Sequence, residues 1–353
     1  MNPFPDPQIA LAGLGWRPDH PAALAWTQAP HGRVARVSEQ HRSGYRVCDG
    51  EREFAVQAPA PWTRKGFAPE QRAVVGDFVR LEAEQDQIVE LLPRSSLLQR
   101  GAAGEHLKVQ PIAANIDTVL VVTGLDRDFN LRRLERYLVL VNASGARPVL
   151  VLTKADRCED VEALRTQLAG IEGGGVAVLA LNARDPASAA QLAPWLGAGN
   201  TVVLVGSSGA GKSTLTNTLM GRDRMKTGAV RSSDARGRHT TTHRALLTLP
   251  HGGCLIDTPG MRELKLTGVE DVADNVFDDI EALAAQCRFR DCRHQAEPDC
   301  AIRAAEQAGT LDSARLGNYL KLMAERAAAA QVLAARQGRP VPGAAQRPRR
   351  TRE

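Results

Sequence analysis

The chain has 353 residues, of which 43% are hydrophobic and 24% charged, a balance typical of a folded protein with two or three domains. The sequence starts with no signal peptide and contains no apolar run long enough for a membrane helix, so we expect a cytoplasmic protein without membrane contact. The formal charge is +5. Six arginines and one glutamate in a basic tail, 336–353, account for it, and we expect this tail to be disordered, as a solvated end or an RNA-contacting arm.

The first third of the chain predicts a small β-domain behind an N-terminal extension. Residues 1–31 are rich in Pro and Ala with little periodicity, so we expect at most a partly helical extension, with no clear role. Residues 32–93 contain about five short alternating segments separated by turn residues, which favours a barrel, and an OB-fold is our first choice. Such barrels often bind nucleic acid. A purely structural β-module is an equal alternative, because 11 basic and 10 acidic residues from 32 to 100 nearly balance.

A polar connector, 94–112, leads to a region where strands and helices alternate. A buried strand at 117–123 precedes an amphipathic helix at 130–140 and a strand at 147–152. A helix near 159–169, a strand at 176–181 and a helix near 187–196 follow. This alternation predicts an α/β domain with a parallel, doubly wound sheet, which we assign to residues 113–268.

A phosphate-binding loop lies inside this domain. An apolar run, 201–205, enters it as a strand, and the segment from Ser213 to Met220 leaves it as a helix. Backbone N–H groups of such a loop surround a phosphate chain, and the helix N-terminus adds a favourable dipole. Lys212 would reach the β- and γ-phosphates, and the Ser213 hydroxyl would bind Mg²⁺. The loop fits G-x-x-x-x-G-K-[ST] and consists of Gly206, Ser207, Ser208, Gly209, Ala210, Gly211, Lys212, Ser213 and Thr214.

Two motifs upstream of this loop indicate guanine as the base. Thr153, Lys154, Ala155 and Asp156 end a predicted strand and resemble the [NT]-K-x-D motif of GTP-binding proteins. The Asp156 carboxylate can accept from guanine N1–H and its 2-amino group, and adenine offers neither in that arrangement. The Lys154 stem can cover the base. At the next strand end, where GTPases usually have Ser-Ala, a backbone N–H reads guanine O6, and this chain has Asn182 and Ala183.

The segment downstream of the phosphate-binding loop completes a GTPase motif set. Asp257 and Gly260 form D-x-x-G, in which Asp257 would hold Mg²⁺ through water and the Gly260 N–H would sense the γ-phosphate. The stretch from Gly237 to Thr242 suits a switch loop whose threonine closes on Mg²⁺. The sequence leaves open whether Thr240, Thr241 or Thr242 does so. Because [NT]-K-x-D precedes the phosphate-binding loop here, reversing the usual order, the domain is predicted to be circularly permuted.

A cysteine and histidine cluster follows, in a segment that we assign to a helical domain at 269–335 with helices near 270–285 and 311–335. Three thiolates and one imidazole fill a tetrahedral structural zinc site and leave no open position for catalysis. A reducing compartment makes disulfides a poor alternative. Arginines between the ligands and a basic stretch at 222–244 suggest contact with phosphates, of the nucleotide or of an RNA. The predicted zinc ligands are Cys287, Cys292, His294 and Cys300.

Over about residues 32–330, this combination resembles the bacterial small-subunit-dependent GTPase A (RsgA) family. The residues that carry the resemblance are the motifs above, the stretch 237–242 and the cluster at 287–300. The resemblance implies slow hydrolysis of GTP to GDP, stimulated by the small (30S) ribosomal subunit late in its maturation, with release on hydrolysis. It also implies that the OB-fold and the zinc domain contact rRNA. We expect a monomer. The alternatives are a GTP-gated RNA-binding module and a permuted GTPase with a non-ribosomal activator.

The predicted catalytic residue is His239. The prediction starts from the position after D-T-P-G, where this chain differs from many GTPases. Met261 follows D-T-P-G, where many GTPases place a glutamine that orients the attacking water. The resembled family also has a hydrophobic residue here, and its water-positioning candidate is a switch histidine that matches His239. A neutral imidazole can orient or deprotonate water. The alternative is that His239 only contacts RNA or phosphate.

Overall fold

The computed structural model describes most of the chain, and the fold below rests on this part. The described residues are 6–41, 44–64, 66–82, 85–101, 109–221, 244–258, 276–289, 292–295 and 297–336, with side chains to 331. Among their helices, none is both long enough and apolar enough to span a membrane.

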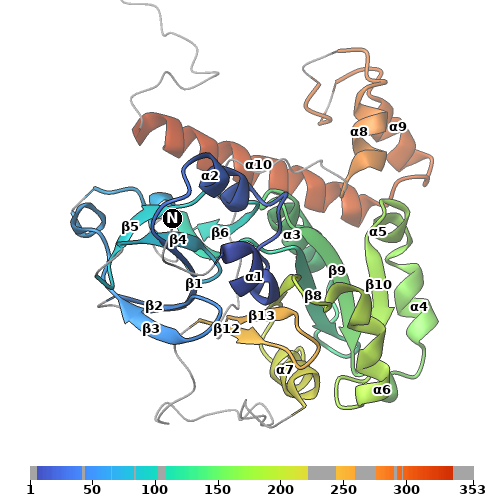
Figure 1. Cartoon of the computed structure of the whole chain (residues 1–353). Helices are drawn as coiled ribbons and strands as arrows, with labels where there is room; N and C mark the ends of the chain where they lie inside the picture. The colour runs from blue at the N-terminus through green and yellow to red at the C-terminus, as the bar shows by residue number, and fades with distance from the viewer. Residues whose placement is uncertain are drawn as a thin grey trace, which may run out of the picture.

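Six strands of an eleven-stranded sheet form the centre of the molecule, and we call this part the central sheet (Figure 1). Five neighbouring strands are parallel, and β12 pairs antiparallel with the last of them, β13. This arrangement confirms the predicted α/β domain. In spatial order the strands are β10 (Ala177–Ala180), β9 (Arg147–Thr153), β8 (Thr118–Gly124), β11 (Thr201–Val205), β13 (Cys254–Asp257) and β12 (Ala245–Thr248).

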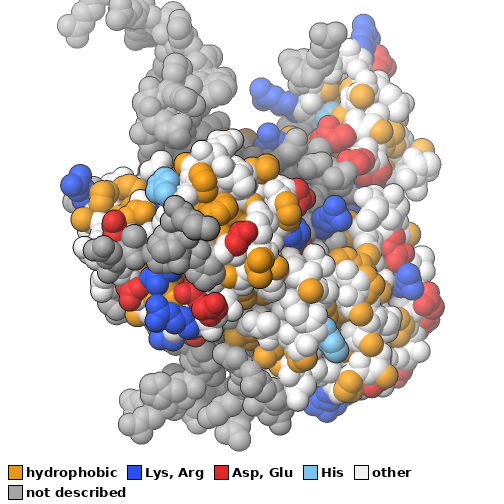
Figure 2. Space-filling view, in the orientation of Figure 1, with side chains coloured by type: hydrophobic (Ala, Val, Ile, Leu, Met, Phe, Trp, Pro, Cys, Tyr) orange, Lys and Arg blue, Asp and Glu red, His pale blue; other side chains and the backbone are white. Residues whose placement is uncertain are grey.

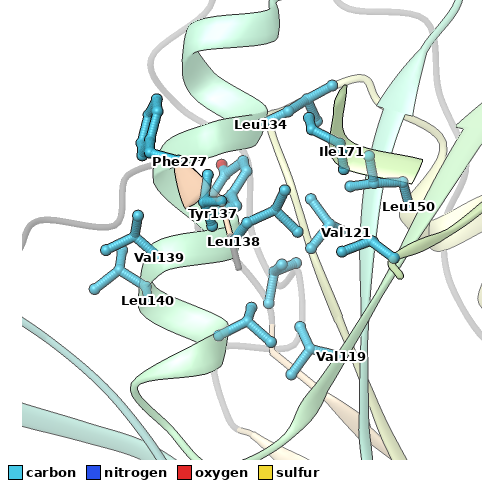
Figure 3. Packing of buried hydrophobic residues seen from close by; sticks show 14 of the residues in the cluster. Val119, Val121, Leu134, Tyr137, Leu138, Val139, Leu140, Leu150, Ile171 and Phe277 are labelled. Atoms are coloured by element: carbon cyan, nitrogen blue, oxygen red, sulfur yellow. The ribbon is translucent and has the colours of Figure 1, made fainter. Parts of the chain in front are cut away.

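Helices cover both faces of this sheet. Because alternate side chains point to opposite faces, Val119 and Val121 pack beneath α3 (Leu131–Asn142), as Figure 3 shows. Leu120 and Val122 pack on the other side, together with Leu215 of α7 (Lys212–Met220). The strands β8 and β11 are therefore buried throughout, as expected of a parallel sheet with two covered faces.

The edge helices are shorter than the sequence predicted. The helix expected near 159–169 is divided into α4 (Val161–Thr166) and α5 (Ala169–Gly173). The helix expected near 187–196 consists of α6 (Pro186–Ala189) and a 3₁₀ segment, Ala190–Trp195. Pro194 lies inside that segment and, lacking an N–H group, cannot continue a regular α-helical ladder.

Five short strands that precede the central strands in the sequence form a second unit of β-structure, which we call the N-terminal β-unit. They confirm a strand-rich N-terminal region. Neighbouring strands pair antiparallel in the order β3-β2-β1-β4-β5, and a parallel bridge from Gln57 to Gln87 joins the two ends. A pairing of Glu39 with Ala245 links β1 to β12 of the central sheet. The strands are β1 (Arg33–Gln40), β2 (Tyr45–Cys48), β3 (Glu53–Val56), β4 (Phe78–Leu81) and β5 (Ile88–Leu91).

The stretch expected to be a polar connector contains an antiparallel hairpin, β6 (Leu97–Gly101) and β7 (Val109–Ala114). Leu98 and Ile112 are fully buried in the core beneath α3. The sequence did not predict these strands, because their few apolar residues gain stability only by packing against residues that are distant in sequence.

The N-terminal segment is folded and partly helical. It contains α1 (Pro7–Ala10), a 3₁₀ turn (Ala12–Leu14) and α2 (Pro21–Gln28). Its buried Trp16 packs edge-on against Phe78 of the β-unit, at 5.0 Å between ring centroids. Cys254 of the central sheet belongs to the same hydrophobic cluster. This segment therefore packs against both the N-terminal β-unit and the central sheet.

Arg36 lies at this junction with no exposed surface. Its guanidinium donates to the carbonyl oxygens of Gly76 (3.0 Å), Asn115 (3.0 Å) and Leu14, and to the Thr201 hydroxyl (2.9 Å). These acceptors belong to both β-units and the N-terminal segment, so one buried cation links all three. Hydrogen bonds to its donors offset part of the cost of burying the charge.

His20, beside Arg36, is expected to make stability depend on pH. Its Nδ1 accepts from the Ala22 N–H at the start of α2. Burial, followed by the charge of Arg36, lowers the pKa of His20 from 6.5 to about 4. Between these two pKa values, His20 is therefore protonated in the unfolded chain and neutral in the folded chain. The contribution of His20 to the free energy of unfolding is therefore complete above pH 6.5. It falls by at most about 3 kcal/mol as the pH falls towards 4.

The variant His20→Asn tests this expectation, because asparagine keeps a side-chain acceptor at the helix start. Free energies of unfolding from denaturant titrations between pH 7.5 and 4 are compared for the two proteins. We expect the wild type to lose more stability than the variant over this range, with most of the divergence below pH 6.5. Parallel curves would show that His20 is not held neutral by the fold.

The C-terminal region contains α8 (Asp278–Ala284), α9 (Ala301–Gln307) and the long helix α10 (Ser313–Arg336). The helix α10 packs on α3 through the fully buried Glu135, which accepts from Arg315 and from Asn318 Nδ2 (2.5 Å). Arg315 also pairs with Asp279 of α8 at 2.8 Å. Polar contacts thus fix α8 and α10 to the central domain.

Candidate nucleotide-binding site and metal centre

The phosphate-binding loop connects β11 to α7, and glycine is required at two of its positions. Gly206 has a φ of 143°, and a Cβ there would lie 2.1 Å from the Val122 carbonyl oxygen. Gly211 has a φ of 97° and immediately precedes α7. Lys212 Nζ donates to the carbonyl oxygens of Gly206 (2.7 Å) and Ser207 (2.6 Å), which places its ammonium group against the loop. This is the arrangement expected of a phosphate-binding loop.

The predicted guanine motif begins at the end of β9 and contacts this loop directly. The Thr153 hydroxyl donates to the Ala210 carbonyl oxygen at 2.6 Å. Lys154 adopts a left-handed conformation with a φ of 63°, and the Ala155 N–H donates to Leu181 after β10. The Asp156 side chain is 38% exposed, so its carboxylate is accessible to a base. Both motifs meet at the carboxyl edge of the sheet, where open α/β sheets bind ligands.

Asn182 and Ala183 form the next turn at this edge. The Asn182 N–H donates to the Ser188 hydroxyl at 2.9 Å, and its side-chain oxygen accepts from the Arg184 N–H at 3.0 Å. Asn182 therefore shapes the turn, and the backbone donor for guanine O6 would be the Ala183 N–H. The Ala183 carbonyl accepts from Thr218 of α7 at 2.6 Å, which fixes the turn to the helix behind the phosphate-binding loop.

Asp257 ends β13, the parallel neighbour of β11. The buried Thr258 hydroxyl donates to the Leu204 carbonyl at 3.1 Å, which holds the end of β13 beside the strand that enters the loop. Other predicted residues lie outside the described residues, and their roles stay predictions. These residues are His239, Thr240, Thr241, Thr242 and Gly260.

Sequence reasoning missed two carboxylates at this site. Lys154 Nζ pairs with Asp126 at 2.7 Å, and Asp128 contacts the phosphate-binding loop. Both follow β8, whose carboxyl end lies at the same sheet edge as the motifs above. Two aspartates spaced D-x-D directly after a buried strand were the signal that could have identified them.

The four predicted zinc ligands lie together in the C-terminal region, with all ligand atoms within 4.8 Å of one another. Cys287 Sγ lies 3.6 Å from His294 Nδ1 and 3.9 Å from Cys300 Sγ, and the latter is 3.5 Å from His294 Nδ1. A tetrahedral ion with Zn–S of about 2.3 Å and Zn–N of about 2.0 Å gives separations of about 3.8 Å for S–S and 3.5 Å for S–N. These distances fit zinc.

The strand order and the order of the motifs define a circularly permuted P-loop GTPase. Solved structures agree. The structure of YjeQ from Thermotoga maritima is similar, with a TM-score of 0.61 and 25% identity over 83% of this chain and 98% of that one. A structure titled YloQ, a circularly permuted GTPase, has a TM-score of 0.59 and 25% identity over 84% of this chain and 95% of that one.

Relatives identify the family. A model of the RsgA GTPase family matches residues 91–267. A protein of Xanthomonas oryzae is 57% identical over 92% of this chain and 91% of its own length. One from Xanthomonas euvesicatoria is 56% identical over 95% of this chain and 94% of its own. Both are named small ribosomal subunit biogenesis GTPase RsgA. The chain belongs to the RsgA GTPase family.

Proposed function

We propose that this chain hydrolyses GTP as a biogenesis factor of the small ribosomal subunit, which stimulates the reaction and from which hydrolysis releases the factor. The observation that carries the proposal is the Thr153–Ala210 hydrogen bond, which joins the guanine motif to the phosphate-binding loop within a permuted GTPase fold. Membership of the RsgA GTPase family and the names of the relatives support the ribosomal role.

The nucleotide would lie along the carboxyl edge of the central sheet. Asp156 would accept from the base, and the Ala183 N–H would donate to guanine O6. Lys212 and the N–H groups of the loop would hold the phosphates. Ser213 and Asp257 would hold Mg²⁺, with one of the switch threonines. The bound ion supplies positive charge that stabilises the phosphates during transfer.

The N-terminal β-unit is proposed to be an OB-fold that contacts rRNA. Its strand order and the parallel bridge between Gln57 and Gln87 support an OB-type barrel. Phe54 of β3 has the guanidinium of Arg33 at 4.5 Å and that of Arg52 at 5.0 Å from its ring centroid. Figure 2 shows basic and acidic side chains side by side over β2 and β3, so recognition here would combine stacking with local charge.

The zinc region is proposed as a second rRNA contact, held in shape by one structural Zn²⁺. Its exposed Phe289 lies under the guanidinium of Arg288, at 5.4 Å. The basic stretch 222–244 and the tail would add further contacts with phosphates. We propose that the protein acts as a monomer in the cytoplasm, one copy to each subunit.

Co-sedimentation with purified ribosomal subunits tests the proposal. We expect the protein to pellet with small but not large subunits when a non-hydrolysable GTP analogue is present, and to leave them when GTP replaces the analogue. The variant Asp156→Ala is the control, because its loss of the guanine contact should abolish the difference between nucleotides. Equal retention with GTP and the analogue would support a GTP-gated RNA-binding module. Pelleting with neither subunit would contradict the ribosomal role.

A further inference from the structure

A carboxylate outside the known motifs contacts the phosphate-binding loop. Asp128 lies in the segment that connects β8 to α3. The Ser207 hydroxyl lies 2.5 Å from Asp128 Oδ1 and 2.6 Å from Oδ2, so it donates to this carboxylate. Ser207 occupies the second position of the loop, which the motif G-x-x-x-x-G-K-[ST] leaves unspecified. The hydroxyl at this position is therefore a feature of this chain rather than of the motif.

Asp128 is itself held in place. Arg133 of α3 pairs with Oδ1 at 2.7 Å, and the Gly124 N–H donates to Oδ2 at 3.2 Å. The Asp128 N–H donates to Asp126 Oδ1 at 3.0 Å, and Asp126 in turn pairs with Lys154 of the guanine motif. The Asp128 side chain is only 15% exposed. A fixed acceptor of this kind can restrict the loop that it contacts.

The phosphate-binding loop is thereby held on two sides. Asp128, after β8, fixes Ser207 near the start of the loop, and Thr153, at the end of β9, fixes Ala210 near its end. Phosphate binding requires several backbone N–H groups to converge on one ligand. A loop that samples several conformations would therefore bind phosphate more weakly, because ordering the loop costs entropy.

We propose that Asp128 is a positioning residue for guanine-nucleotide binding, acting through the Ser207 hydroxyl to hold the phosphate-binding loop in its binding conformation. This inference rests on the proposed function, since it concerns the same site. If Asp128 holds the loop, removing its carboxylate should weaken nucleotide binding. Charge alone predicts the opposite, because removing a negative charge near the phosphates would strengthen the binding of an anion. The sign of the change therefore separates positioning from electrostatics.

A double-mutant cycle tests the proposal with full-length protein and fluorescent GDP and GTP analogues. Ser207→Ala removes the hydroxyl and keeps the carboxylate, and we expect it to raise both dissociation constants by about tenfold. Asp128→Ala should raise them at least as much, and the double variant no further than Asp128→Ala, since the two residues act through one contact. Arg127→Ala is the matched control: this exposed neighbour in the same segment should leave affinity unchanged.

Steady-state GTP hydrolysis supplies a second readout. Loss of positioning should raise KM and leave kcat within about twofold, because it weakens ground-state and transition-state binding alike. A merely structural role would lower the melting temperature and the active fraction without changing the affinity of the folded protein. Unchanged or tighter binding by Ser207→Ala, or independent effects in the double variant, would overturn the proposal. Failure of the wild type to bind guanine nucleotides would instead overturn the proposed function.

Discussion

The variant Cys300→Ser is expected to lose the zinc ion that we propose for the Cys/His cluster, and to unfold the region between α8 and α10 locally. Cys300 is buried at the N-cap position of α9, and its sulfur lies within 4 Å of both Cys287 Sγ and His294 Nδ1. A serine hydroxyl is a much poorer zinc ligand than a thiolate. The metal contributes on the order of 10–16 kcal/mol to such small folds, far more than their few apolar contacts.

Two measurements on the intact protein test this prediction. Native mass spectrometry should find one zinc per wild-type chain and none in the variant, and hydrogen exchange should show lost protection in α8 and α9. The control is Cys48→Ser, which changes a half-buried cysteine of β2 outside the cluster and should retain the zinc. If the wild type carries no metal and its α8 and α9 are still fully protected from hydrogen exchange, this region folds without a metal ion and the prediction is wrong.

The variant His239→Ala is expected to bind GTP normally and to lose the stimulation of hydrolysis by the small subunit. Removing the group that orients or deprotonates the attacking water should lower stimulated kcat by about 100- to 10,000-fold, the usual range for general acid–base catalysis. Affinity should be preserved, because the predicted base and phosphate contacts are made by other residues.

Single-turnover hydrolysis with saturating small subunits measures this effect, and fluorescent-analogue binding checks the affinity. His251→Ala is the matched control, since this exposed histidine lies in the turn between β12 and β13. An unchanged stimulated rate in His239→Ala would support the alternative role, in which this histidine only contacts RNA or phosphate.

The central domain could be predicted from sequence because its signals are local. The apolar run 201–205 became β11, and the run around Val119 became β8, since strands buried on both faces consist of continuous apolar residues. The four candidate zinc ligands were predicted from spacing and chemistry, and the structure brings them together.

The remaining features depend on contacts between distant segments. Burial of the N-terminal segment is set by Trp16 against Phe78, 62 positions apart, and no local pattern reports that contact. Arg36 reads as an ordinary polar residue of an alternating strand, yet it is fully buried between three segments. Asp128 contacts Ser207 only because β8 and β11 are neighbours in the sheet, an order that permutation obscures in the sequence.

Activation by the small ribosomal subunit is the property on which the proposed function depends. The most direct test is the rate of GTP hydrolysis by the purified protein, alone and with small or large subunits, with ATP as the nucleotide control. We expect a slow basal rate that rises by orders of magnitude with small subunits only, because GTPases with incomplete sites depend on a partner to complete them. A rate that neither subunit changes would contradict the claim and point to a different activator.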